Sequence, residues 1–257
     1  MERKQKLMLI RAGQLVNLEG ADYFFTGRGE AAEGDPYSAF NICDYTGDTP
    51  EHVAACRQRL ASHLGIEPEA IIVPRQVHGA TVAHIDAPGW RGEADAVITG
   101  REGICLTVST ADCVPILLYD PVHRAIGAVH AGWRGLVAHI IPRAVEAMTE
   151  AFGSHPADLY GITGPAISPE VYEVGSEVAD EFRRAGFREA VVKPSDKEGK
   201  AYVDLWQSAL DELHAAGLQP EHTDTVGLCT YLSPALLSSA RRLGIASGRI
   251  SGCIILK

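Results

Sequence analysis

The sequence has no long apolar run and no block of positive charge. Its 257 residues carry a formal net charge of −10, and no cluster of Lys and Arg offsets that charge. A surface of this kind repels polyanions, which excludes nucleic acids and anionic membranes as expected partners. A small phosphate-bearing substrate stays open, because one pair of arginines can hold a phosphate.

The N-terminal segment offers only a short apolar run, Leu7 to Ile10. This run is shorter than the core of a secretory signal peptide, and no later stretch approaches the ~20 apolar residues of a membrane-spanning helix. These absences predict a cytoplasmic protein with no membrane partner.

Paired metal-binding motifs are also missing. None of the six cysteines forms a C-x-x-C pair, which excludes a zinc ribbon and a thioredoxin-type motif. Cysteines in apolar runs, such as Cys105 and Cys253, are expected to be buried small hydrophobic residues. None of the ten histidines forms an H-x-H pair. Because multicopper clusters need many histidines, often paired in this way, full laccase chemistry is not expected.

The chain shows no repeat, no low-complexity tract and no clear linker, so a single domain over residues 1–257 is predicted. The most loop-like stretches, 29–37 and 193–200, are too short to divide domains. Three helices are predicted from apolar spacing and end signals. They cover residues 50–64, 136–152 with a kink at Pro142, and 204–217.

Short β-like runs lie between these helices. They are Ala70–Val73, Ala96–Thr99, Ile104–Ser109, Val114–Tyr119, Ala125–Val129 and Arg249–Leu256. The runs come in consecutive groups that helices interrupt only in places. This pattern favours an α+β fold with mixed sheets and helices packed outside over strict βαβ alternation.

Polar residues with chemical potential gather between residues 75 and 135, near the ends of apolar runs. The motifs are RQVHG (Arg75–Gly79), EADAVITG (Glu93–Gly100), STADC (Ser109–Cys113) and VHAGWRG (Val129–Gly135). Sheet proteins commonly build their sites where strands end. We therefore expect the functional site here.

His78, Cys113 and His130 are candidate metal ligands. They lie 35 and 17 residues apart, each just beyond a β-like run, so strand ends could bring them to one edge. Two imidazoles and a thiolate suit zinc, and three protein ligands leave a fourth position for water or substrate. Spacing alone leaves two alternatives open: ordinary satisfied or exposed histidines, and a cysteine hydrolase with Cys113 as nucleophile and His78 or His130 as base.

Other polar residues complete the candidate site. Arg134 lies in a glycine-flanked turn before a predicted helix, where a guanidinium and backbone N–H groups could hold an anion. Arg75 could add a second positive charge. Asp95 and Asp112 could orient a histidine or act as a base, although a capping or turn role suits either. Cys113, Asp95 and Arg134 are the candidate catalytic residues; Arg75, Asn41 and Asp112 are the candidate substrate-binding residues.

The four motifs together closely resemble the laccase-domain family, often labelled polyphenol oxidase and related to an unusual type of purine nucleoside phosphorylase. The resemblance runs through nearly the whole chain. It includes FNICDYTGD (Phe40–Asp48), GPAISPEVYEVG (Gly164–Gly175), YVDLW (Tyr202–Trp206) and CTY (Cys229–Tyr231). It implies a single domain with a layered helix–sheet–sheet–helix arrangement and a metal, usually zinc with copper as the alternative, at His78, Cys113 and His130.

The resemblance also implies an activity: phosphorolysis of adenosine, inosine and methylthioadenosine, with adenosine deamination beside it. The expected partners are then a nucleoside and phosphate. In some bacterial relatives the implied role is instead the editing of peptidoglycan precursors at an amide bond. One position departs from the family pattern, because relatives often have a histidine where this chain has Tyr45, which puts any substrate contact of that histidine in doubt.

Overall fold

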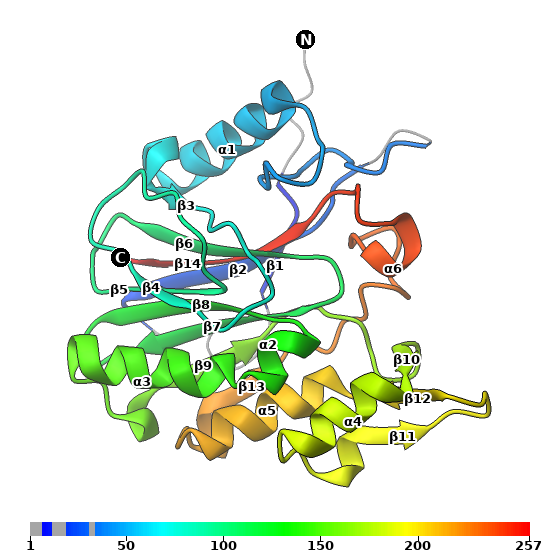
Figure 1. Cartoon of the computed structure of the whole chain (residues 1–257). Coiled ribbons are helices and arrows are strands. Elements are labelled where there is room, and N and C mark those ends of the chain that lie inside the picture. Colours follow the sequence, from blue (N-terminus) through cyan, green and yellow to red (C-terminus); the bar gives the residue numbers. More distant parts are fainter. Residues whose placement is uncertain (1–6, 12–18, 31–33) are drawn as a thin grey trace.

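The computed structural model describes residues 7–11, 19–30 and 34–257, and two sheets stacked face to face form its centre (Figure 1). The first sheet has the strand order β1 (Leu9–Ile10), β2 (Ala21–Thr26), β14 (Ile250–Leu256), β6 (Cys105–Thr110) and β3 (Ile71–Ile72). The second has the order β13 (Thr223–Thr225), β9 (Tyr160–Thr163), β7 (Val114–Asp120), β8 (Ala125–Ala131), β5 (Ala96–Thr99) and β4 (Val82–His84). Both sheets mix parallel and antiparallel pairs.

Helices cover the outer faces of this pair of sheets, as Figure 1 shows. The helix α1 (Pro50–Leu64) lies on the five-stranded sheet, while α3 (Ile140–Phe152) and α5 (Leu205–Ala215) lie on the six-stranded sheet. The remaining helices are α2 (Trp133–Val137), α4 (Ser176–Arg184) and α6 (Ala240–Leu243), with single 3-10 turns at Pro68–Ala70, Pro156–Asp158, Glu189–Val191 and Pro220–His222. A small sheet of β10 (Glu173–Gly175), β12 (Lys200–Val203) and β11 (Val192–Pro194) flanks α4. This is the predicted helix–sheet–sheet–helix arrangement with mixed sheets.

Alternation along each strand produces the layers. In β2, Tyr23 and Phe25 point into the space between the sheets, whereas Phe24 packs under α1 with Leu60. In β7, Leu117 faces the other sheet. Successive side chains of a strand point to opposite faces, so strands buried on both faces read as continuous apolar runs. This is why the sequence shows runs here rather than a clear alternation.

The predicted elements are present with shifted ends. Each of the six β-like runs overlaps a strand, and the helix at 50–64 has the predicted signals, with Thr49 as N-cap and Gly65 closing it at φ 70°. Asp204 caps α5. Of the two predicted loops, 29–37 includes residues 31–33, outside the described part, and 193–200 joins β11 to β12. No helix of the described residues is long and apolar enough to cross a membrane.

The prediction of one helix kinked at Pro142 is wrong. The chain instead forms α2 and α3 with a break between them, where His139 adopts a left-handed conformation with φ 57°. Pro142 lies in the first turn of α3, where a backbone N–H has no helical partner to lose. The proline therefore fits the start of a helix and does not distort it.

We expect Gly164→Ala to destabilise the fold. A Cβ at this position would overlap the buried ring of Phe25 between the two sheets. Overpacking a rigid core costs about 1–3 kcal/mol. The free energy of unfolding should fall by this amount, and the urea concentration at the midpoint of unfolding should fall with it.

The matched control is Gly100→Ala, whose Cβ would lie 3.4 Å from the nearest atom, in ordinary contact. Equal midpoints for the two variants would contradict the close approach of Gly164 to Phe25.

Candidate metal centre

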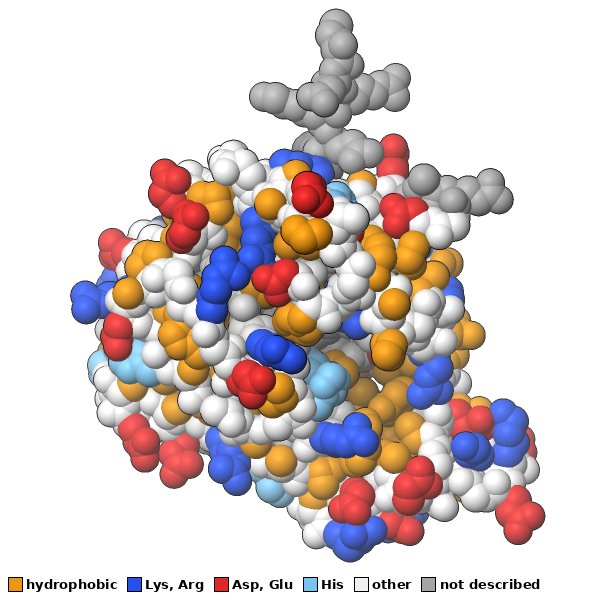
Figure 2. Space-filling view, turned by 45° about the horizontal axis from the view of Figure 1, so that its top comes forward, with side chains coloured by type: hydrophobic (Ala, Val, Ile, Leu, Met, Phe, Trp, Pro, Cys, Tyr) orange, Lys and Arg blue, Asp and Glu red, His pale blue; other side chains and the backbone are white. Residues whose placement is uncertain are grey.

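His78, Cys113 and His130 converge in the structure. Their ligand atoms all lie within 4.8 Å of one another, and the two imidazole rings meet edge to face with centroids 4.8 Å apart. His78 is exposed, Cys113 is half-buried and His130 is buried. Figure 2 shows a hollowed face on which histidine, arginine or lysine, and hydrophobic side chains lie together. The trio therefore has one side open to solvent.

Strand pairing brings two of the three residues together. Cys113 lies in the turn before β7, and His130 lies inside β8, which is two residues longer than the predicted run. These strands are antiparallel neighbours, with Val114 opposite Ala131 and Pro115 opposite His130. The start of β7 and the end of β8 lie at the same end of the sheet. Cys113 and His130 are therefore close together although they are 17 residues apart in the sequence. His78 reaches this edge from the loop before β4.

Asp95 connects the two histidines. This fully buried carboxylate accepts hydrogen bonds from the backbone N–H groups of His78 (2.9 Å) and Gly79 (2.7 Å), and its Oδ1 lies 2.8 Å from Nδ1 of His130. It also accepts from the N–H of Val77 at 3.3 Å. Such a partner fixes the orientation of a histidine and directs its other nitrogen outward. Nε2 of His130 is thereby left for a ligand role.

The electrostatics favour an ionised Asp95. Burial acts to raise the pKa of this carboxyl, but the hydrogen bonds from His130, Gly79 and Val77 together lower it below its usual range. The carboxylate is therefore charged at neutral pH and fully engaged by donors. This geometry suits a group that positions others better than a group that exchanges protons with a substrate.

Cys113 is an activated thiol. Burial opposes ionisation, yet the neighbouring His130 and His78 lower its pKa to about 6. The pKa of His130 is raised in turn: burial lowers it, but Cys113 and Asp95 raise it more. In the protein without metal, the two groups form a thiolate–imidazolium pair at neutral pH. A thiolate is the form that binds metals.

The backbone around the trio leaves no room for larger residues. A Cβ on Gly132 would lie 2.8 Å from Sγ of Cys113 and 3.3 Å from Cδ2 of His78. His78 itself has a left-handed backbone with φ 59°. Left-handed non-glycine residues are uncommon and often mark functional sites. The segments that carry the trio are thus packed closely against each other.

Asp112 anchors the turn that carries Cys113. It has φ 101°, and its carboxylate accepts hydrogen bonds from the hydroxyl of Thr230 and the backbone N–H of Arg241, both at 2.7 Å. Its carbonyl accepts from Ile167 at 2.9 Å. These bonds tie the turn to two distant segments, so Asp112 has a clear structural use beside any contact with substrate.

The two candidate arginines stand at the surface. Arg134 lies in the first turn of the five-residue helix α2, and its guanidinium stacks 4.2 Å above the ring of Trp133. The side chain of Arg75 is 70% exposed and lies 3.6 Å from Glu93. Both can move to meet an anion, since neither is held in a buried network.

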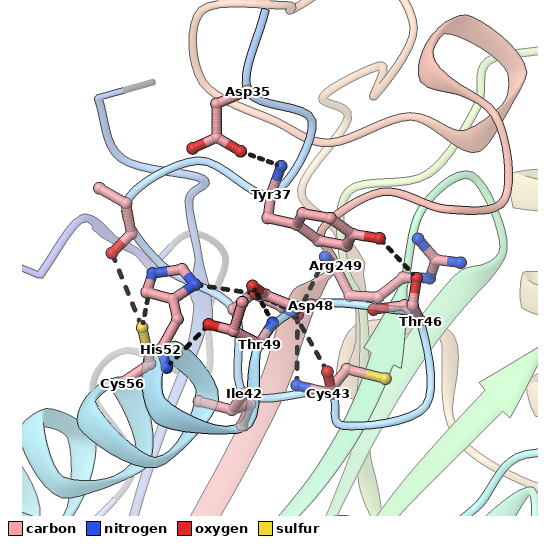
Figure 3. Close-up of polar contacts among 12 residues, drawn as sticks. Asp35, Tyr37, Ile42, Cys43, Thr46, Asp48, Thr49, His52, Cys56 and Arg249 are labelled. Atoms are coloured by element: carbon pink, nitrogen blue, oxygen red, sulfur yellow. Dashed lines mark hydrogen bonds and ion pairs between the residues drawn. The ribbon is translucent and has the colours of Figure 1, made fainter. Parts of the chain in front are cut away.

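The polar atoms of Asn41 are engaged inside its own loop and with Arg249. Asn41 is fully buried, and its amide bonds to the carbonyl of Cys43 and to the carboxylate of Asp48. Its Oδ1 accepts from the backbone of Cys43 and of Arg249. Figure 3 shows Asp48 at the centre of the polar contacts in this loop. Asn41 therefore holds the loop in shape from within.

Tyr45, at the position where the sequence resemblance implies a histidine in relatives, connects this loop to the segment before His78. Its hydroxyl interacts with the thiol of Cys43 and with the backbone of Gln76, two residues before His78. Burial is the main cause that raises the pKa of this phenol. The residue therefore stays neutral, and the loop contacts the segment that carries His78 without a second imidazole.

Two residues near the trio were not predicted from sequence. The half-buried Tyr172 lies within electrostatic reach of Cys113, Asp112 and Arg134, and its pKa is raised, chiefly by burial and then by Cys113. The guanidinium of Arg241 lies 5.3 Å from the centroid of the Tyr172 ring. Tyr172 lies in a segment that resembles the family, but neither its spacing nor that of Arg241 signals a site. Only the tertiary fold brings them here.

Known proteins are similar to this chain over most of its length. The chain is similar to a protein of Bacteroides thetaiotaomicron named purine nucleoside phosphorylase, at 37% identity over 95% of this chain and 94% of the relative. A protein named adenosine deaminase RL5, from an unknown prokaryotic organism, is 36% identical over 92% of this chain and 94% of its own length.

Solved structures share the fold. The hypothetical protein YfiH of Bacillus licheniformis superposes with a TM-score of 0.90 at 25% identity, covering 99% of this chain and 98% of that one. YlmD of Geobacillus stearothermophilus superposes at 0.86 with 29% identity, covering 93% of each chain.

The model of the family described as multi-copper polyphenol oxidoreductase laccase matches residues 22–257. This match covers most of the chain and includes every residue of the site described above. It confirms the resemblance seen in the sequence motifs. The chain belongs to this laccase-like family, whose relatives include enzymes named for purine nucleoside phosphorolysis and adenosine deamination.

Proposed function

We propose that this protein is a zinc-dependent cytoplasmic purine nucleoside phosphorylase that also deaminates adenosine. The observation that carries the proposal is the convergence of His78, Cys113 and His130 within 4.8 Å. The names of the relatives support the choice of reaction. The proposed substrates are adenosine, inosine and methylthioadenosine, with phosphate as the second substrate.

The donor set fits zinc. The donor atoms of the trio lie within 4.8 Å of one another, so a small closure would bring all three to the bond lengths of about 2.0–2.3 Å that zinc requires. The thiol is already ionised at neutral pH because its pKa is about 6. A sulfur with two nitrogens suits zinc better than magnesium or calcium. When bound, zinc supplies Lewis-acid polarisation of water or of a substrate oxygen.

Three residues of the chain have proposed roles in the two reactions. In phosphorolysis, phosphate attacks C1′ of the ribose, the bond to the purine nitrogen breaks, and ribose 1-phosphate leaves with the free base. Arg134 holds the phosphate, and Arg75 adds charge at the rim. In deamination, water replaces the 6-amino group and ammonia leaves. Asp95 acts as a positioning residue in both, because its oxygens already accept four N–H donors.

A second candidate function is cysteine-dependent hydrolysis. Cys113, His130 and Asp95 form a thiolate, an imidazolium and an orienting carboxylate, the arrangement on which nucleophilic cysteine enzymes rely. The two functions differ in their need for metal. Full activity after chelation would favour the hydrolase, and activity that returns only with added zinc would favour the phosphorylase.

The first prediction concerns metal content. Purified protein should contain close to one zinc per chain by elemental analysis, and replacing His78, Cys113 or His130 singly with Ala should remove most of it. Two remaining ligands seldom hold zinc tightly. The exposed His155 serves as the control, and His155→Ala should keep its zinc. Full occupancy in all three ligand variants would rule out this site.

The second prediction concerns thiol reactivity in the metal-free protein. Iodoacetamide at pH 7 should modify Cys113 first, because its pKa of about 6 leaves it ionised. The thiol is ionised at pH values above its pKa, so the rate of modification should fall as the pH drops through about 6. Cys56 is the internal control, because burial raises the pKa of its thiol.

Peptide mapping by mass spectrometry measures the modification at each cysteine. Zinc should protect Cys113 if it is a ligand. Equal modification with and without zinc would contradict the ligand assignment.

The third prediction concerns Arg134. Losing a charge-assisted contact that strengthens in the transition state costs ~2–4 kcal/mol, or roughly 30- to 1000-fold in rate. Arg134→Ala should therefore slow inosine phosphorolysis by this factor while zinc stays bound. Adenosine deamination needs no phosphate and should suffer less.

The control is Arg143→Ala, an exposed arginine of α3. Release of hypoxanthine and formation of ribose 1-phosphate are followed with and without phosphate. Base release that ignores phosphate would argue against phosphorolysis.

A further inference from the structure

A cavity lies beside the break between α2 and α3, where His139 and Pro142 line it. It has a volume of about 430 Å³ and opens between the start of α3, the segment after α4, and α5. Its apolar walls come from Pro142, Ala185, Phe187 and Ala215. None of the three metal ligands lines it. In Figure 1, α3, α4 and α5 lie together below the six-stranded sheet.

A buried carboxyl lies at the floor of this cavity. Glu212 of α5 is 4% exposed, and its Oε2 has no hydrogen-bond partner among the described residues. Its other oxygen, Oε1, lies 2.6 Å from Nδ1 of His139. Leaving a buried polar oxygen unpaired costs free energy, and native proteins seldom do so without a use.

His139 covers this carboxyl. It occupies the break between α2 and α3 with a left-handed backbone, and its side chain is 48% exposed. Its ring stacks on Phe187 with centroids 6.0 Å apart and an angle of 14°. A non-glycine residue in this conformation is strained. The ring can turn outward because one side of it faces solvent.

Glu212 has one possible charge partner in the described structure, the imidazole of His139 at 2.6 Å. The guanidinium of Arg188 is committed to Asp211 at 2.6 Å, and His214 bonds to the hydroxyl of Thr223 at 2.8 Å. Burial raises the pKa of Glu212 to about 8, so the carboxyl is mostly protonated at neutral pH. A positive ligand beside it would stabilise the ionised form.

We propose that this cavity is a second binding site, which takes a small organic cation with an aromatic or other apolar body. The apolar part lies against Phe187 and Pro142, and the protonated amine or amidine donates to Glu212 once the His139 ring turns outward. Pockets with apolar walls and a few convergent polar groups are the usual form of small-molecule sites. The proposal does not depend on the reaction at the metal centre.

Benzamidine is the probe, and the nearly isosteric but uncharged benzamide is its control. Titration of the wild-type protein by calorimetry should show one saturable benzamidine site and at least tenfold weaker binding of benzamide. In wild-type protein, NMR signals of His139 and Phe187 should shift saturably with benzamidine. Equal binding of the two compounds, or shifts elsewhere, would overturn the proposal without any variant.

Two variants distinguish the role of the Glu212 carboxyl from that of the His139 ring. Glu212→Gln keeps the shape and an acceptor but removes the charge, and should weaken benzamidine by about tenfold or more, because a charge-assisted hydrogen bond is lost. His139→Gly suits the left-handed backbone and exposes Glu212, so it should bind benzamidine at least as tightly as wild type. Zinc content should match wild type in both. Unchanged benzamidine binding in Glu212→Gln would overturn the assignment to Glu212, and loss of binding only in His139→Gly would show that the imidazole holds the ligand.

Discussion

The hydrogen bonds of the Asp95 carboxylate are the interactions on which the metal centre depends. One buried side chain receives the backbone of the His78 loop and the ring of His130. The two segments lie on either side of β5 in the sequence, and neither contacts the other through regular strand pairing. A buried charge is costly unless several donors satisfy it, and here four do. The same bonds that stabilise the charge therefore fix both histidines.

The thiol of Cys113 is prepared for a metal by its neighbour. The imidazolium of His130 stabilises the thiolate, and the lowered pKa of Cys113 follows from that neighbour. A metal ion at the proposed site would take the place of the His130 proton as the positive charge next to the sulfur. Because the thiol is already ionised near neutral pH, the free-energy cost of binding such an ion would be lower.

Much of the architecture could be predicted from the sequence, because the signals were local. Apolar runs identified the central strands, and Thr49, Pro50 and Gly65 marked the ends of α1. Pro142 was misleading: the break occurs at His139, where tertiary contacts with Glu212 and Phe187 hold a conformation that no local signal announces. The metal trio was found by residue type and family resemblance. Residues around it, such as Tyr172 and Arg241, come from segments that only the fold brings near.

The three proposed ligands differ in exposure, and this difference bears on how an ion would enter and leave. The pairing of β7 with β8 holds His130 beside Cys113, at the start of β7, whereas His78 lies on an exposed loop. An ion bound at the proposed site would be reached from the solvent side, and His78 would be the ligand that detaches first. Exchange would then need no unfolding. The metal found in the protein would depend on which ions the folded chain meets as well as on the donor set.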